Sequence, residues 1–361
     1  MAIEQRTQHP FHLYEAILSQ PEAFAQVVCR TEAAADAFAA QVAASARLFL
    51  TGTSYHAAQA GEHLARAYVN ELPVHAAHGF DFALYGPRLT PDDCVVGISH
   101  RGNKGYTVEA LRRARAAGCR TALIAGEGKA EGSTYADVTF PTVAPEKSYP
   151  HTVSYVGALA VLATLIERLG YHRLGRPVLA RQFLHGELPR ALQTALGTEQ
   201  QMADLARAHR DRRFFWPTGA GPGAVTAQEI ALKIKETAYR PAEGMSVEAL
   251  LHGPFLSAQA EDLFLLIAPA GPAQGRIVEL ARMVETIGAA YLVVGDGTAH
   301  ALEPGAAGWC VVPAVPEPFT ILTCLIPLQL FAYYLALAHG TNPDRSRLED
   351  PRFARAYGLT H

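Results

Sequence analysis

An internal repeat sets the architecture that this chain has to adopt. Gly52 ends an apolar run, and Gly219 ends a similar run 167 residues later. The dipeptide Gly86-Pro87 recurs at the same spacing as Gly253-Pro254. Solenoid repeats are several times shorter, so two copies at this spacing predict two similar domains. We expect N-terminal helices and the first domain in residues 1–190, and the second domain and a C-terminal tail in residues 191–361.

Each copy alternates short apolar runs with helical patterns. The expected strands are Arg47–Thr51, Cys94–Ser99 and Thr121–Ala125 in the first copy, and Phe264–Ala268 and Tyr291–Val294 in the second. Continuous apolar strands separated by helices predict an α/β fold, with a parallel sheet covered on both faces. Ligands of such sheets bind beyond the C-terminal ends of the strands. The first loops to consider are therefore Thr53–His56, Ser99–Thr107 and Thr218–Gly223.

Composition excludes several classes of protein. With 49% hydrophobic and 18% charged residues, the chain is not extensively disordered. Its 31 basic and 34 acidic side chains lack the basic excess of nucleic-acid-binding proteins. Five scattered cysteines without a C-x-x-C fit a reducing compartment and argue against a disulfide framework or a cysteine zinc site. Because the N-terminus also lacks a signal-peptide core, we expect a cytoplasmic protein that binds no nucleic acid.

One apolar stretch, Ile321–Ala338, has two interpretations. Its length is near the lower limit of a membrane span, and a buried helix has the same composition. Pro327 and Gln329 lie within it, and no other segment looks membranous. The buried helix is therefore favoured, and no membrane association is expected.

Two loops after expected strands carry groups suited to an anion. Gly52-Thr53-Ser54 precedes a helix, where free N–H groups bind anions, although a hydroxyl there also serves as an ordinary helix cap. Ser99–Lys104 combines a glycine, a hydroxyl and two cations, which suits a phosphate but also describes a solvated basic loop. Neither loop has P-loop or dinucleotide-binding spacing, so no nucleotide cofactor is expected.

The segment Glu229–Glu236 (EIALKIKE) carries the most informative spacing. On a helix, Glu229, Lys233 and Glu236 share one face. A carboxylate beside an ammonium suits acid/base chemistry, whereas the alternative is an exposed salt-bridge face. His252 follows on an expected loop, and an imidazole suits proton transfer near neutral pH. The histidines show no metal-binding motif, so no metal site is expected.

These motifs resemble a known family. Gly52-Thr53-Ser54-Tyr55, the Ser99-x-x-Gly102 loop, Glu229-x-Ala-Leu-Lys-x-Lys-Glu236 and His252-Gly-Pro254 are similar to the tandem SIS (sugar isomerase) domains of the isomerase half of glucosamine-6-phosphate synthase. The resemblance covers about Phe11 to Asp344. It implies two αβα sandwich domains around parallel sheets, a homodimer, and a phosphosugar bound between domains at a site that a neighbouring subunit completes.

The resemblance also implies roles for individual residues. Thr53, Ser54 and Ser99 would bind the phosphosugar. The other substrate-binding residues expected from the same two loops are Gly52, His100, Arg101, Gly102 and Lys104. Glu236 would be the base that moves a proton between C1 and C2 through an enediol-like intermediate, supported by Lys233 and Glu229. His252 would assist ring opening, in its own chain or from the partner subunit.

Three departures from the family modify these expectations. Arg101 and Lys104 stand where the family has hydroxyls, so the ligand carries more negative charge or binds differently. The tail, residues 342–361, lacks the family's lysine; its basic residues are Arg345, Arg347, Arg352, Arg355 and His361. Arginine cannot form an imine, which argues against amino transfer. No glutaminase domain or N-terminal nucleophilic cysteine is present, so no glutamine amidotransferase activity is expected.

Two functions remain open at this point. The first is an enzyme acting on a sugar phosphate, either an aldose–ketose isomerase or an amino-sugar-phosphate deaminase or deglycase. The second is a non-catalytic SIS protein that senses sugar phosphates. The pairing of Glu236 with His252 favours the enzyme. The residues do not select a particular sugar.

Overall fold

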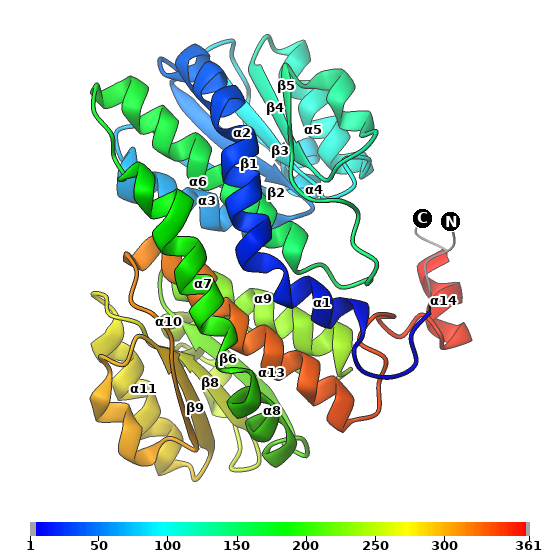
Figure 1. Cartoon of the computed structure of the whole chain (residues 1–361), viewed down its shortest axis with the longest axis vertical. Helices are drawn as coiled ribbons and strands as arrows, with labels where there is room; N and C mark the ends of the chain where they lie inside the picture. Colours follow the sequence, from blue (N-terminus) through cyan, green and yellow to red (C-terminus); the bar gives the residue numbers. More distant parts are fainter. Residues whose placement is uncertain (1–4, 359–361) are drawn as a thin grey trace. The chain divides into compact units, whose positions relative to one another are not determined.

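The computed structural model describes residues 5–358, which divide into two compact units. The first unit comprises residues 19–146 and 152–190. The second unit comprises residues 5–18, 147–151 and 191–358. Each unit is built around a parallel sheet of its own (Figure 1).

The sheet of the first unit has five parallel strands in the order β2-β1-β3-β4-β5. They are β1 (Arg47–Gly52), β2 (Val74–His78), β3 (Asp93–Ile98), β4 (Arg120–Ala125) and β5 (Val138–Pro141). The inner strands β1, β3 and β4 are almost wholly buried, in agreement with their continuous apolar runs. The sequence did not predict the edge strands β2 and β5, because they are partly exposed and carry no such run.

Helices cover both faces of this sheet (Figure 1). On one face α2 (Gln20–Val42) and α3 (Tyr55–Tyr68) both contact α6 (Val153–Leu174), and on the other α4 (Gly79–Tyr85) contacts α5 (Gly105–Ala116). The short helices are η1 (Glu131–Tyr135) and η2 (Phe183–Glu187). Alternate strand residues, among them Phe49, Val95 and Leu123, belong to the core under α5, as the strand pleat requires.

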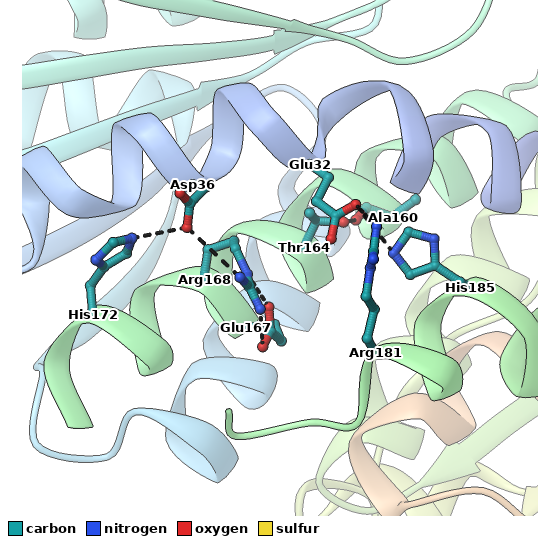
Figure 2. A network of polar contacts seen from close by, with 9 residues as sticks. All are labelled: Glu32, Asp36, Ala160, Thr164, Glu167, Arg168, His172, Arg181 and His185. Carbon is teal, nitrogen blue, oxygen red and sulfur yellow. Dashed lines mark hydrogen bonds and ion pairs between the residues drawn. The ribbon is translucent and has the colours of Figure 1, made fainter. Parts of the chain in front are cut away.

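A network of polar side chains joins α2, α6 and η2 within the first unit (Figure 2). Asp36 on α2 lies 2.9 Å from Nε2 of His172 and 3.8 Å from Arg168. One turn earlier, Glu32 accepts a hydrogen bond from Arg181 (2.9 Å) and lies 3.6 Å from His185. Burial by itself raises the pKa of Glu32, but Arg181 and His185 outweigh it and lower that pKa. These charges bind α2 to its neighbours in addition to apolar packing.

The second unit repeats the connectivity of the first. Its parallel strands are β6 (Phe215–Gly219), β7 (Met245–Ser246), β8 (Leu263–Ile267), β9 (Ala290–Gly295) and β10 (Gly308–Val311), in the order β10-β9-β8-β6-β7. Read from the β7 edge, this is the order of the first sheet with β6 in the place of β1. The α/β fold and the duplication expected from the sequence are therefore confirmed.

Helices again cover both faces of the second sheet (Figure 1). α8 (Glu199–Ala208) and α9 (Pro222–Thr237) contact α13 (Leu325–Ala338), and α10 (Val247–Leu251) contacts α11 (Gln274–Thr286). The remaining elements are α1 (His12–Leu18), η3 (Pro254–Ser257), η4 (His300–Gly305), η5 (Glu317–Phe319), α12 (Thr320–Thr323) and α14 (Pro351–Gly358). α7 (Leu188–Leu196) carries the chain from the first unit into the second.

The N-terminal segment belongs to the second unit, whereas the sequence assigned all of residues 1–190 to the first domain. The backbone N–H groups of His12 and Leu13 donate to the Asp344 carboxylate (3.0 and 2.8 Å), which satisfies two free donors at the start of α1. The Tyr14 hydroxyl donates to Glu199 on α8 (2.8 Å). A side chain more than 300 positions away provides this cap, so no local pattern reveals it.

Two helical stretches are long and apolar enough to cross a membrane by length and composition alone: Val153–Leu174 and Glu317–Ala338. Most of the apolar window of each is buried within the structure, 94% and 83% respectively. The core helix of a globular domain passes the same test. The second stretch contains the predicted Ile321–Ala338, which the structure divides at Cys324 between α12 and α13.

Candidate functional site

The turn after β1 is tightly fitted against β3. A Cβ atom on Gly52 would lie 2.0 Å from the carbonyl oxygen of Ile98, so no larger residue fits without moving the backbone. The N–H group of Ser54 donates a hydrogen bond to this same oxygen (3.3 Å). The Ser54 side chain makes no capping hydrogen bond to α3. Thr53 and Ser54 are thereby held at the C-terminal edge of the sheet.

Three hydroxyl groups gather at this edge. The N–H of Thr53 donates to the Thr107 hydroxyl (3.2 Å), and the Thr53 hydroxyl lies 3.5 Å from that of Ser99. Ser99 and Thr107 are each about 1% exposed. Thr107, in the first turn of α5, was not singled out from the sequence. Its position could have indicated it, because Thr107 ends the loop that begins at Ser99. It also lies at the start of a helix that follows the C-terminal end of a strand.

The loop after β3 combines a half-buried histidine with exposed cations. The Glu146 N–H donates to Nε2 of His100 (3.3 Å), which requires that this nitrogen is unprotonated. Burial, and to a smaller extent the charge of Arg101, lowers the pKa of His100 to about 4. Arg101 and Lys104 are exposed. Neither side chain forms a hydrogen bond or ion pair with another residue between positions 5 and 358.

The second unit places the predicted acid/base residues on one face of α9. Pro222 opens this helix after Gly221, whose φ of 50° suits glycine. The Lys233 ammonium lies 3.4 Å from the Glu229 carboxylate and donates to Glu236 at 2.6 Å. The side chains of Glu229 and Lys233 are each only 5% exposed, and that of Glu236 is 24% exposed. The alternative of an exposed salt-bridge face is therefore wrong for the first two residues.

His252 lies apart from these three residues. Its ring occupies the end of α10, where Nδ1 lies 2.8 Å from the Glu248 carbonyl oxygen and 3.5 Å from the Glu248 carboxylate. The side chain is 75% exposed. Within the described part of the second unit, no hydrogen bond or ion pair joins His252 to Glu236. The structure thus assembles Glu229, Lys233 and Glu236 but leaves His252 facing solvent.

The tail is attached to the end of α9. Tyr239 follows this helix with φ of 56°, and its hydroxyl accepts a hydrogen bond from the Arg347 N–H (2.6 Å) and donates to Glu349 (3.1 Å). The Arg347 guanidinium lies over the rings of Phe353 and Tyr239, at 4.3 and 5.5 Å from their centroids. Arg347 is therefore occupied by packing. His361 lies outside the described residues.

The fold defines the general class of this protein: two parallel α/β domains of one topology, with polar loops at the strand ends. The sequence model of the SIS domain matches residues 42–168 and 209–339, and the chain belongs to this family. Both predicted SIS domains are thereby confirmed.

A curated relative is similar over most of this chain. It is the glutamine–fructose-6-phosphate aminotransferase [isomerizing] of Pyrococcus horikoshii, 30% identical over 339 residues. The match covers 93% of this chain and 56% of the relative, so the chain spans little more than half of that protein's length.

Solved structures share the fold at low sequence identity. The C-terminal domain of glucosamine-fructose-6-phosphate aminotransferase from Francisella tularensis has a TM-score of 0.83 and 19% identity, covering 94% of this chain and 99% of that one. Tagatose-6-phosphate ketose/aldose isomerase from Escherichia coli has a TM-score of 0.78 and 17% identity, and the match covers 95% of this chain and 96% of that one. Glucosamine-6-phosphate deaminase from Thermotoga maritima has a TM-score of 0.73 and 17% identity, and the match covers 93% of this chain and 97% of that one. At these identities the likeness concerns the fold.

Proposed function

We propose that this protein is an enzyme that acts on a sugar phosphate by moving a proton between C1 and C2. The reaction is either an aldose–ketose isomerisation or the deamination of an amino-sugar phosphate. The observation that carries the proposal is the row of linked charges on α9, in which Glu229 and Lys233 are buried and Glu236 is partly exposed. Burying charges costs free energy even when they are paired, so a function is the simplest reason to keep a buried pair beside a third charge on one helix face.

Glu236 suits the role of the base. Its carboxylate is paired with the Lys233 ammonium, yet it is the most exposed of the three side chains. Partial exposure gives a substrate access to this carboxylate. It would take the proton from one carbon of the open-chain sugar and return it to the neighbouring carbon. Glu229 and Lys233 would act as positioning residues.

The hydroxyl groups of the first unit suit the sugar's phosphate. Thr53, Ser99 and Thr107 lie at the strand ends beside the N-terminus of α5, where a helix favours an anion. A held phosphate fixes the carbon chain relative to a base, which is how positioning contributes to catalysis. Gly52, Ser54, His100 and Gly102 would shape the same loops.

His252 would assist ring opening. Its exposed ring at the end of α10 supports a role in the site of a neighbouring subunit. We therefore also infer a homodimer. The five cysteines without C-x-x-C spacing favour a reducing compartment, so we place this homodimer in the cytoplasm.

The assay that tests this proposal separates the two reactions. Purified protein is incubated with glucosamine 6-phosphate and with aldose and ketose 6-phosphates, and ammonia and ketose are measured separately. Ammonia release supports the deaminase, and interconversion without ammonia supports the isomerase. Absence of both with all substrates, from folded protein, would contradict the proposal.

A sugar-phosphate sensor without catalysis is the second candidate. The lysine-free tail and the two cations in the loop after β3 favour it. A sensor binds a sugar phosphate with equal affinity in the wild type and in Glu236→Gln, and neither protein turns it over. Calorimetric binding beside the turnover assay distinguishes the two candidates.

A further inference from the structure

Three cations lie on two adjoining loops at the C-terminal edge of the first sheet. Arg101 and Lys104 belong to the loop after β3, and Lys129 belongs to the loop after β4. All three side chains are exposed. The chain has only five lysines beside 26 arginines, and two of the five lie here. We call Arg101, Lys104 and Lys129 the cation cluster.

The backbone brings the two loops together. Gly102 has φ of 61°, and a Cβ atom on it would lie 2.4 Å from the Ala130 Cβ. The N–H of Gly132 donates to the Gly102 carbonyl oxygen at 2.8 Å. Lys129 precedes Ala130, and Arg101 precedes Gly102. The contact therefore places their backbones side by side, and no side chain larger than hydrogen fits at Gly102 without separating them.

The cation cluster has no neutralising partner among residues 5–358. The acidic groups of the adjoining segments are occupied elsewhere: Glu127 pairs with Arg30, and the Glu146 carboxylate accepts hydrogen bonds from Thr152 and Ser154 at the start of α6. Glu131 follows on η1 and forms no ion pair with the cluster in this part of the chain. Three positive charges are thus presented together to solvent.

One phosphate does not account for these charges. Three hydroxyl groups, those of Thr53, Ser99 and Thr107, already lie beside the N-terminus of α5. A helix N-terminus contributes about half a positive charge, and hydroxyl and amide donors satisfy phosphate oxygens directly. The second unit provides a comparison: its loops after β8 and β9 carry no cation between Pro269 and Ala273 or between Asp296 and Thr298.

We propose that the cation cluster recognises a second anionic group of the substrate. The substrate class is a sugar phosphate that also carries a carboxylate or a second phosphate. Both groups accept the paired N–H bonds of an arginine, and lysines add point charges. This inference rests on the proposed function, because it assigns the phosphosugar to the same strand-end loops.

The test compares ligands that share a 6-phosphate and differ in whether they carry a second anionic group at C1. Dissociation constants are measured by calorimetry at low salt for glucose 6-phosphate, glucose 1,6-bisphosphate and 6-phosphogluconate. At least one of the two doubly anionic ligands should bind 10-fold or more tightly than the monophosphate. This preference should fall steeply as salt rises, because exposed charges are screened. Whichever of the two ligands shows the preference identifies the second group as phosphate or carboxylate.

Substitutions then assign the preference to the cluster. In the triple variant Arg101→Ala, Lys104→Ala, Lys129→Ala, the preferred doubly anionic ligand should bind about as tightly as the monophosphate, so that the ratio of their dissociation constants is about one. Arg115→Ala and Arg120→Ala are the matched controls. They remove exposed arginines of the same unit near the N-terminal ends of the strands, away from the cation cluster. They should therefore leave this ratio of dissociation constants unchanged. Melting temperatures show whether each variant is folded.

The outcomes separate this inference from the proposed function. If the monophosphate binds as tightly as both doubly anionic ligands, the inference is overturned and the proposed function stands. The same holds if the triple variant keeps the preference. If no sugar phosphate binds to folded protein, both fall together.

Discussion

The two SIS domains place different side chains on one scaffold. In both, a glycine ends the first inner strand and a helix begins three residues later: Gly52 and α3 in the first, Gly219 and α9 in the second. The strand ends of the two domains carry different groups. Ser99 follows β3, but Ala268 occupies the matching position after β8, where its N–H makes the matching hydrogen bond to Val294. The fold therefore determines where a group stands, and the sequence of each copy decides which group it is.

The helices after these glycines show the same division. Glu62 and Arg66 on α3 have the spacing of Glu229 and Lys233 on α9, 167 residues earlier. Arg66 donates to Glu62 at 2.6 Å but is 65% exposed. Lys233 is buried between two carboxylates. Identical spacing thus gives a surface ion pair in one domain and a candidate acid/base group in the other, and the following predictions test this difference.

The largest effect is expected for Glu236→Gln. The amide keeps the shape of the side chain but cannot accept a proton, and loss of a general base costs about 10³-fold in kcat. Affinity for the sugar phosphate should change little, as calorimetry will show. Glu62→Gln on α3 is the matched control and should leave kcat within a factor of two. Equal losses in both variants would contradict the assignment of the chemistry to α9.

Next in size is Lys233→Met. Removing one member of a buried ion pair leaves charges without compensation and destabilises a protein by about 3 kcal/mol or more. Arg66→Met removes the equivalent member of the exposed pair and should cost less than about 1 kcal/mol. Urea unfolding at neutral pH measures both values. Similar costs would mean that burial does not distinguish the two pairs.

The first domain should also respond to pH through His100, which has no histidine counterpart after β8. Its pKa of about 4 lies below the ordinary value of 6.5, so the unfolded chain binds this proton first. Stability from this group is complete above pH 6.5 and is lost as pH falls towards 4. The loss is on the order of 2 kcal/mol for a partly exposed ring. His100→Gln should show a smaller decrease between pH 7 and 4.5, measured by urea unfolding against the wild type.

The smallest effect is expected for Thr107→Val, which removes one hydroxyl from the strand-end loops. A lost hydrogen bond to a charged phosphate weakens binding about tenfold. Thr226→Val on α9 is the control, because Thr226 is likewise a fully buried threonine near the start of a helix but belongs to the other domain. It should leave the dissociation constant of the sugar phosphate unchanged. An unaltered dissociation constant in Thr107→Val would remove Thr107 from the proposed phosphate site.

Much of the fold was predictable from sequence, because inner parallel strands are continuous apolar runs and the repeat doubles the evidence for each. The edge strands β2 and β5 were missed because their partly exposed residues lack that pattern. The face shared by Glu229, Lys233 and Glu236 followed from helical spacing alone. Their burial did not, since Glu62 and Arg66 show the same spacing although the Arg66 side chain is 65% exposed. Thr107 was missed because what places its hydroxyl beside the other two is a hydrogen bond from the Thr53 backbone, 54 positions away.

The cap on α1 has a consequence for the order in which the chain is made. The first unit is complete in the chain once residue 190 has been synthesised. The second unit is still incomplete at that point. The Asp344 carboxylate, which accepts hydrogen bonds from the N–H groups of His12 and Leu13, is synthesised more than 300 residues after them. Domains fold as units during synthesis, so residues 5–18 remain without their partner while the whole first domain forms. A segment that emerges before the first domain is thus among the last to reach its final place.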